Sequence, residues 1–462
     1  MRRHATLAGL LAALVLMASA MALAQFRLPQ PPVPDVGDIL RDQLDLRIPD
    51  LRRILEEPPA LSSSFDDAVT GVPFLDDLDP IVTAPMSQLP FSGDGAFIVA
   101  LPGVYELQAC SFCLHAGVSG PGRGEGYLYA PLSGSLAGVI QTVLDGAMVH
   151  PEVGQREVQS LIWAIQSRAK VSEMPAELQE AARVLLTRDQ INRLNGGALG
   201  MIPEELFDQA FVDVPDEVRM VMEAEARLRR RLQQEVYDFE ALETIAVLSG
   251  EPTQEDIAEV PRGRWSWTPD GFFVRYFPSS YPETTIQLYA PEAFTVARDA
   301  AGRISEITNR YGGRIEVAYA TDGPVAATGD VRAHTLASLR LVAPTGQAIE
   351  LACSADDLVL TGLPAGTGPG GEVGALYQVA AETMQQVREL AGHVPGASSD
   401  PERLTALADL AQFTDAFERA TAEAVTAAPG LRNWLNMART ACASELTVLL
   451  GRQPVGGGLA AV

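Results

Sequence analysis

The spacing of hydrophobic and polar residues changes along the chain from mixed strand and helix, to strand, and then to helix. Residues 96–107 alternate and are rich in β-formers, which predicts strands. Helical spacing follows in four segments: 136–148, 157–169, 176–186 and 216–248. An aromatic, β-rich stretch begins after Pro261, and helical spacing returns in three closing segments: 376–392, 402–427 and 431–450. The pattern predicts a multidomain α+β protein.

Changes in composition divide the chain into seven expected segments. They are a signal peptide at 1–24, a Pro-rich acidic leader at 25–90, a mixed strand and helix module at 91–199, a long helical connector at 200–258, an antiparallel β module at 259–361, a Gly/Pro linker at 362–374 and a helical bundle at 375–462. The leader's prolines favour an extended spacer, or a strap over the next domain, with one short helix near 39–55.

A basic cluster lies in the long helix expected at 216–248. Its members are Arg227, Arg229, Arg230 and Arg231. Acidic residues stand four positions away from two of them, Glu223 from Arg227 and Glu235 from Arg231, which is the spacing of stabilising pairs on a helix. We interpret the cluster as a solvated helix face.

The N-terminus carries the features of a secretory signal. Arg2 and Arg3 precede an apolar run over 8–17, and small residues at Ala22 and Ala24 follow it. The run is shorter than the roughly 20 residues that cross a bilayer, so we expect cleavage rather than a retained anchor. The mature protein is expected to be secreted or periplasmic, with no membrane insertion after signal cleavage.

The charge balance is strongly acidic. The chain has 34 basic and 59 acidic residues, a formal net charge of −25. Such a surface repels phosphate backbones and anionic headgroups, which excludes nucleic acid as an expected partner. The charge also keeps an exported protein soluble.

The most specific chemistry lies in two short motifs of the 91–199 module. Phe112-Cys113-Leu114 ends a predicted strand, and the run Val158-Gln159-Ser160-Leu161-Ile162-Trp163 begins a predicted helix. A thiol and a carboxamide condense into a thioester if the fold holds them together in a dry, aromatic enclosure. Gln159 and Trp163 fall on one helix stripe, so the indole is expected to cover the carboxamide.

These residues resemble the thioester domains of Gram-positive surface adhesins. In that family an aromatic residue or Leu, Cys and an aliphatic residue precede a distant aliphatic-Gln-x-x-aliphatic motif. The resemblance covers roughly 91–199. It implies that Cys113 and Gln159 are joined, with Phe112, Tyr127 and Trp163 as the enclosure. The downstream half is unlike such adhesins, and no array of stalk domains follows.

Disulfide bonding is the competing interpretation of the cysteines. The four cysteines of an exported chain allow two bridges, in three possible connectivities. One solution pairs Cys110 with Cys113 and Cys353 with Cys442. If Cys113 is instead joined to Gln159, an odd thiol remains, so both interpretations stay open.

Cys113 also stands in patterns that fit a redox, haem, zinc or catalytic role only in part. A redox Cys110-x-x-Cys113 lacks the surrounding βαβ pattern. Haem attachment requires His directly after the second cysteine, where Leu114 stands, and zinc ligation by Cys110, Cys113, His115 and His150 has irregular spacing. We therefore expect no cofactor and no metal. The enzymatic alternative is a cysteine-dependent hydrolase or transferase that pairs Cys113 with His115 or His150.

A second, weaker resemblance covers about 294–319. Asp299-Ala300-Ala301-Gly302-Arg303 and Tyr311-Gly312-Gly313-Arg314 resemble the YD repeats of Rhs-type surface proteins, without the long tandem array. That resemblance implies a small antiparallel sheet that serves as a shell or a contact face.

The predicted function is covalent capture of an amine on a partner protein or glycan surface, with no turnover. The alternatives are the hydrolase or transferase, and a structural, disulfide-stapled surface protein whose β module mediates contacts.

Overall fold

The structure is a computed structural model. It describes residues 60–62, 71–92, 96–120, 125–196, 216–234, 236–248, 260–328, 331–362, 372–393, 400–451 and 458–460. The expected signal peptide, the short helix near 39–55 and most of the linker at 362–374 lie outside these residues. Within them, no helix combines the length and the apolar character needed to cross a membrane.

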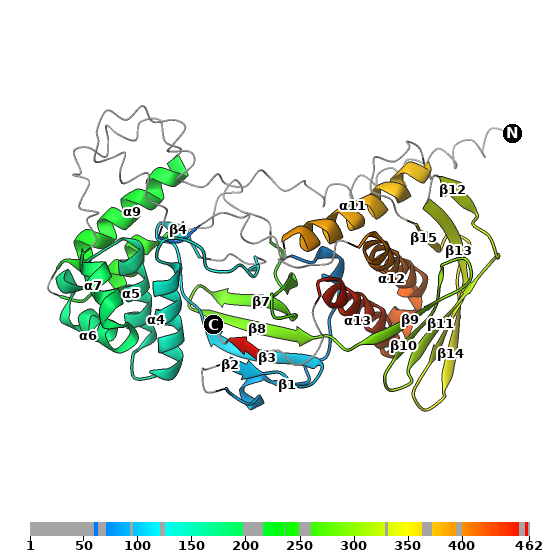
Figure 1. The fold of residues 1–462 in the computed structure, drawn as a ribbon, viewed down its shortest axis with the longest axis horizontal. Helices are drawn as coiled ribbons and strands as arrows, with labels where there is room; N and C mark the ends of the chain where they lie inside the picture. Colours follow the sequence, from blue (N-terminus) through cyan, green and yellow to red (C-terminus); the bar gives the residue numbers. More distant parts are fainter. Residues whose placement is uncertain are drawn as a thin grey trace.

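Three bodies follow one another across the molecule (Figure 1). A helical lobe lies at one end, a central sheet in the middle, and a curved sheet with three helices on its inner side at the other end. Helices and two main sheets together confirm the predicted mixed α+β class and the helical C-terminal region.

The central sheet joins distant parts of the chain. Its order is β1 (Ala84–Pro85), β3 (Gly103–Cys110), β8 (Glu283–Ala290), β7 (Phe273–Ser280) and β6 (Ser266–Trp267). β1 is parallel to β3 and the other neighbours are antiparallel. Along β3 and β8 the register runs from Gly103 opposite Ala290 to Cys110 opposite Glu283. The segments expected at 91–199 and 259–361 therefore share one sheet, and their expected boundaries do not separate it.

The end of the acidic leader forms a strap across this sheet. Val72, Leu75 and Leu78 are fully buried in the same core as Trp265. The indole of Trp265 donates a 3.1 Å hydrogen bond to the carbonyl of Leu78, and Arg275 donates another of 3.1 Å. The buried apolar residues hold this part of the leader as a strap and not as a free spacer.

The curved sheet is antiparallel. It contains β9 (Phe294–Arg298), β10 (Ile304–Asn309), β11 (Arg314–Tyr319), β12 (Ala326–Thr328), β13 (Val331–Val342), β14 (Ala348–Ala352) and β15 (Leu358–Thr361). The YD-like segment supplies β9 to β11, so an antiparallel sheet does form there. Its two turns require glycine, because Gly302 and Gly312 have φ of +80° and +84°.

The C-terminal helices pack on the inner side of the curved sheet (Figure 1). They are α11 (Glu372–His393), α12 (Pro401–Ala427) and α13 (Arg432–Leu449), close to the three predicted segments. Phe413 and Phe417 of α12 are fully buried in the core that also holds Ile307 and Leu339 of the sheet. Trp434 of α13 is partly buried against this core.

The helical lobe contains α4 (Ala137–Val149), α5 (Gln155–Gln166), α6 (Ala176–Leu185), α7 (Arg188–Gly196), α9 (Asp216–Leu232) and α10 (Phe239–Ala246). Two short ladders lie outside the main sheets: β2 (Ala96–Ile98) pairs with β16 (Gly458–Ala460), and β4 (Val118–Ser119) pairs with β5 (Val247–Leu248).

The single helix expected over 216–248 is wrong, because the structure has α9 and α10 with a break between them. Asp238 starts α10 by accepting a 3.1 Å hydrogen bond from the Ala241 backbone. The arginine cluster is also not a purely solvated face. Arg229 reaches inward to the Ser167 carbonyl at 2.6 Å, and Arg231 pairs with Asp238 at 2.6 Å.

Candidate functional site

The loop that carries Cys113 follows β3 and is fastened to the central sheet. β3 ends at Cys110, and the next residue, Ser111, makes two bonds to the β7–β8 turn. Its backbone N–H donates to Pro282 O at 3.0 Å, and its hydroxyl donates to Tyr281 O at 2.8 Å. Farther along, Gly117 N donates to Ala246 O of α10 at 2.7 Å. The loop is thus held at both ends, with Cys113 between them.

Helix α5 brings Gln159 to this loop. Its apolar stripe is fully buried in the helical lobe, with Leu161 and Ile162 at 0% exposure and Gln159 at 2%. At its first turn, the Gln155 carboxamide donates to Pro282 O at 2.7 Å and to Ser111 O at 3.2 Å. Gln155 therefore ties the helix, the turn and the loop together.

The two residues singled out from the sequence are in direct contact. Cys113 N donates to Gln159 Oε1 at 2.7 Å, and Gln159 Nε2 donates to Cys113 O at 2.9 Å. The carboxamide is thereby fixed in plane and orientation against the main chain of the cysteine. Moving this buried amide would break both hydrogen bonds and leave polar groups unpaired, so its position is well defined.

The thiol of Cys113 is held in its neutral form. Its sulfur donates to the carbonyl of His115 at 2.8 Å. Burial raises the thiol pKa, against smaller lowering contributions from the His115 backbone and the Trp163 side chain. Such a cysteine is a poor free nucleophile. It suits a reaction in which placement replaces intrinsic reactivity.

Trp163 closes the inner side of the site. It is fully buried and stacks on Phe239 of α10, with ring centroids 5.8 Å apart. Its indole N–H faces the Cys113 sulfur and has no hydrogen-bond partner of ordinary geometry. A buried N–H without a hydrogen-bond partner lowers the stability of the fold. Its orientation toward the sulfur therefore indicates that the indole is part of the site.

The other two expected enclosure residues are half-buried. Phe112 packs against the core of the helical lobe. Tyr127 packs edge to face on Tyr276, with ring centroids 6.2 Å apart. Burial raises the pKa of Tyr127 to about 12, with smaller contributions from the charges of Cys113 and Glu125. The sequence predicts all three aromatic residues at the site. In the structure the Trp163 side chain interacts with the thiol, and Tyr127 lies near enough for the charge of Cys113 to affect its pKa.

Several residues of the site were missed from the sequence. They are Gln155, Phe239, Tyr281 and Glu243. A local signal existed only for Phe239, because Asp238 before it is a strong N-cap residue and marks a helix start. Tyr281 and Glu243 reach the site through tertiary packing that no local pattern reveals.

Neither histidine of the enzymatic alternative pairs with the thiol through its ring. His115 meets Cys113 through its main-chain carbonyl, and burial lowers the pKa of its imidazole, against a raising hydrogen bond to the Ser62 backbone. His150 ends α4 and pairs with Glu152 at 2.8 Å on the surface. A nucleophilic Cys–His pair is not assembled at Cys113.

All four cysteines are free thiols in the structure. Cys110 is exposed on β3, Cys353 is half-buried, and Cys442 lies buried in α13, 3.3 Å from the Thr414 hydroxyl. Neither of the considered bridges, Cys110 to Cys113 or Cys353 to Cys442, is present. Among the described residues, no cluster of His, Cys, Asp and Glu has the arrangement of a metal site.

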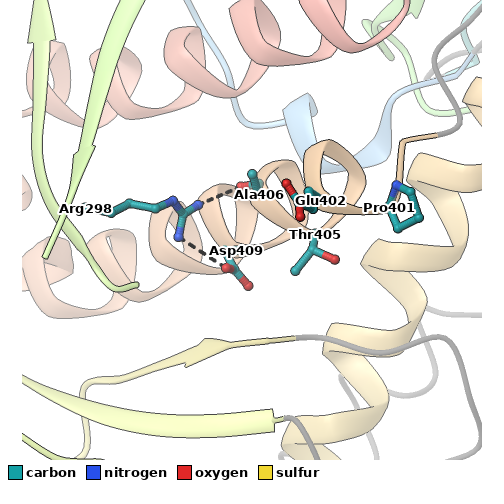
Figure 2. A pocket seen from close by; sticks show the side chains of 6 residues that line it. All are labelled: Arg298, Pro401, Glu402, Thr405, Ala406 and Asp409. Carbon is teal, nitrogen blue, oxygen red and sulfur yellow. Dashed lines mark hydrogen bonds and ion pairs between the residues drawn. The ribbon is translucent and has the colours of Figure 1, made fainter. Parts of the chain in front are cut away.

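A separate surface hollow lies at the start of α12 (Figure 2). It is lined by Arg298, Pro401, Glu402, Thr405, Ala406 and Asp409. Arg298 spans it, with bonds of 3.2 Å to Asp409 and 3.1 Å to Ala406 O. The pairing of Arg298 with Asp409 joins β9 of the curved sheet to α12 at this hollow.

Asp409→Asn is expected to remove a pH-dependent loss of stability. Burial raises the pKa of Asp409 to about 6, although Arg298 and the Gly362 N–H lower it. The folded state therefore binds more protons than the unfolded state above the ordinary value of 3.8, and its stability falls as pH rises toward 6. In urea denaturation from about pH 4 to about pH 8, the variant should gain on the order of 2–3 kcal/mol over the parent. A difference that stays constant with pH contradicts this.

Comparison with known proteins adds no relative, because no family model, no curated protein and no solved structure matches the chain.

Proposed function

We propose that Cys113 and Gln159 form an internal thioester, and that the protein uses it once to capture a primary amine on a partner surface. The paired hydrogen bonds between the Cys113 main chain and the Gln159 carboxamide carry this proposal. They hold the acyl group against the main chain of the residue that carries the sulfur, and fixed placement of this kind can supply effective concentrations of about 10⁵–10⁸ M in place of a bimolecular encounter.

The bond-forming step follows from the contacts. The thiol leaves the His115 carbonyl by rotation about the Cα–Cβ bond of Cys113, and its sulfur attacks the side-chain carbonyl carbon of Gln159. Negative charge develops on Oε1, which already accepts the Cys113 N–H at 2.7 Å. A preorganised donor at that oxygen lowers the barrier. The thiol proton passes to Nε2, which leaves as ammonia, and a carbon–sulfur bond replaces the carbon–nitrogen bond.

Capture reverses the roles of the groups. An amine nitrogen bonds to the acyl carbon, the carbon–sulfur bond breaks, and the sulfur recovers a proton as a thiol. The product is a secondary amide between Gln159 and the partner. Burial of Gln159 at 2% exposure and of Trp163 at 0% limits competition by water. We further propose that the chain acts outside the cytoplasm, as its N-terminal sequence predicts.

The hydrolase alternative has weaker support at this site. A hydrolytic cysteine needs a base to remove its proton, and neither His115 nor His150 presents its ring to the sulfur. Burial also raises the pKa of Cys113, the opposite of an activated thiolate.

Intact mass tests the proposal directly. The mass of the purified protein should be lower by one ammonia than the mass calculated from its sequence. Incubation with methylamine should raise the measured mass by one methylamine. Cys113→Ala should abolish both changes. Cys110→Ala, three residues upstream and exposed, should leave both intact and serves as the matched control. A parent protein at full mass with a free thiol at Cys113 would refute the proposed function.

A further inference from the structure

A tyrosine and a glutamate from two different elements meet beside the Cys113 loop. Tyr281 lies in the turn between β7 and β8, and its carbonyl accepts the Ser111 hydroxyl at 2.8 Å. Its hydroxyl donates a hydrogen bond to the carboxylate of Glu243 on α10. Burial first, then the bond and the charge of Glu243 and the charge of Cys113, raise the pKa of Tyr281.

Among the described residues, Glu243 has no cationic partner. In the part of the chain that the structure describes, no Lys or Arg forms an ion pair with it, and the Tyr281 hydroxyl is its hydrogen-bond partner. One turn earlier on α10, Glu240 is paired with Arg156 at 2.9 Å. Glu243 is half-buried, so its negative charge is less screened than that of a fully exposed carboxylate.

The position of α10 is fixed by several contacts with the site. Asp238 caps the helix, Phe239 stacks on Trp163, and Ala246 O accepts the Gly117 N–H at 2.7 Å. The Tyr281 turn is fixed as well, by Ser111 and by Gln155. The tyrosine and the glutamate are therefore held in place relative to the loop, as a proton-transferring pair requires.

We infer that Tyr281 and Glu243 form the pair that accepts a proton from the incoming nucleophile, and that the substrates are cationic primary amines such as lysine side chains. This inference rests on the proposed thioester. A lysine ammonium, with an ordinary pKa of about 10.4, cannot attack until it loses a proton. The ammonium donates to the Tyr281 oxygen while the Tyr281 hydroxyl proton moves to Glu243.

The proton balance is then complete. The neutral amine attacks the acyl carbon of Gln159, and the second proton lost from nitrogen goes to the departing Cys113 sulfur. Glu243, protonated in the first step, releases its proton to water. The high pKa of Tyr281 suits this role, because the tyrosine stays protonated and acts as a relay while Glu243 is the final acceptor. The negative charge of Glu243 also favours approach of a cation.

Two nucleophiles test the inference. Methylamine is protonated at neutral pH and needs the pair, whereas hydroxylamine is already neutral there. Glu243→Gln and Tyr281→Phe should each slow methylamine capture by about 10²-fold and change hydroxylamine capture little. Glu240→Gln on the same helix is the matched control and should behave like the parent.

The outcomes separate the inference from the proposal beneath it. Intact mass is recorded before any nucleophile is added, so each variant is first shown to contain the thioester. If both nucleophiles are slowed equally, or if neither is slowed, Tyr281 and Glu243 do not have this role, although the thioester proposal stands. Absence of the ammonia loss in the parent protein overturns the proposed function and this inference with it.

Discussion

Gln159→Glu is expected to leave the protein at its full mass and unreactive toward methylamine. The substitution keeps the size of the side chain and the oxygen that accepts the Cys113 N–H at 2.7 Å. It replaces the nitrogen that leaves as ammonia with an oxygen, and a carboxylate is a poor acyl donor. The variant therefore tests the acyl chemistry of Gln159 without emptying its site.

The same variant should reveal how tightly the site holds the side chain. An ionised glutamate faces the Cys113 carbonyl with no donor, where Gln159 donates at 2.9 Å. A protonated glutamate restores that donor, so burial should raise the pKa of the new carboxyl. The stability of the variant should therefore fall by on the order of 2 kcal/mol between low pH and the pH at which the group is ionised.

Urea denaturation at about pH 5 and about pH 8 measures this difference. Gln234→Glu, an exposed amide just after α9, is the control and should alter neither reactivity nor stability. If Gln159→Glu still loses mass or incorporates methylamine, Gln159 is not the acyl donor.

The elements that the sequence predicted well are those whose pattern is local and long. The three C-terminal helices have apolar residues at helical spacing over many turns, and their predicted limits are close to α11, α12 and α13. The strands of the YD-like segment are short but separated by glycines, and Gly302 and Gly312 indeed occupy turns with positive φ. Local propensity and tertiary structure agree in these regions.

The sequence-based predictions fail where tertiary contacts or a single N-cap residue determine the structure. The apolar spacing of 216–248 continues across the break and so predicts one helix through Asp238, whereas Asp238 is the N-cap at which α10 starts. The prolines of the leader are compatible with a spacer or a strap, and only tertiary packing, which buries Leu75 and Leu78 fully, distinguishes the two. Pairing of β3 with β8 joins strands far apart in sequence, and no local pattern specifies it.

The candidate site was predicted in part, for the same reason. Cys113 and Gln159 stand in motifs that a sequence displays, and the structure brings them into contact. The sequence does not identify Gln155 as a site residue, because its hydrogen-bond partners, Ser111 and Pro282, belong to two other segments of the chain. The motifs specify the reacting groups, whereas the supporting contacts depend on the assembled sheet.

Trp163→Ala is expected to destabilise the fold and expose the thioester to water. Removing a fully buried indole that stacks on Phe239 should cost about 3–5 kcal/mol in the free energy of unfolding. It also leaves a void beside the Cys113 sulfur, on the side that the indole N–H now faces. Water entering there should hydrolyse the bond to a free thiol and a glutamate at position 159.

Peptide mapping distinguishes hydrolysis from failure to form the bond. A glutamate at position 159 shows that the thioester formed and was lost, whereas an intact amide shows that it never formed. Trp163→Phe keeps an aromatic ring against Phe239, so it should cost less stability and show slower hydrolysis than Trp163→Ala.

Trp267→Ala is the matched control for these effects. Trp267 lies in β6 with 1% exposure, and its indole N–H also lacks a partner, so its removal should destabilise the fold by a similar amount. It packs in the core shared by the central and curved sheets, whereas Trp163 packs in the core of the helical lobe. Trp267→Ala should therefore retain the thioester at temperatures where it is folded. Equal loss of the bond in both variants would show that Trp163 protects it only through global stability, because a specific enclosure predicts loss in Trp163→Ala alone.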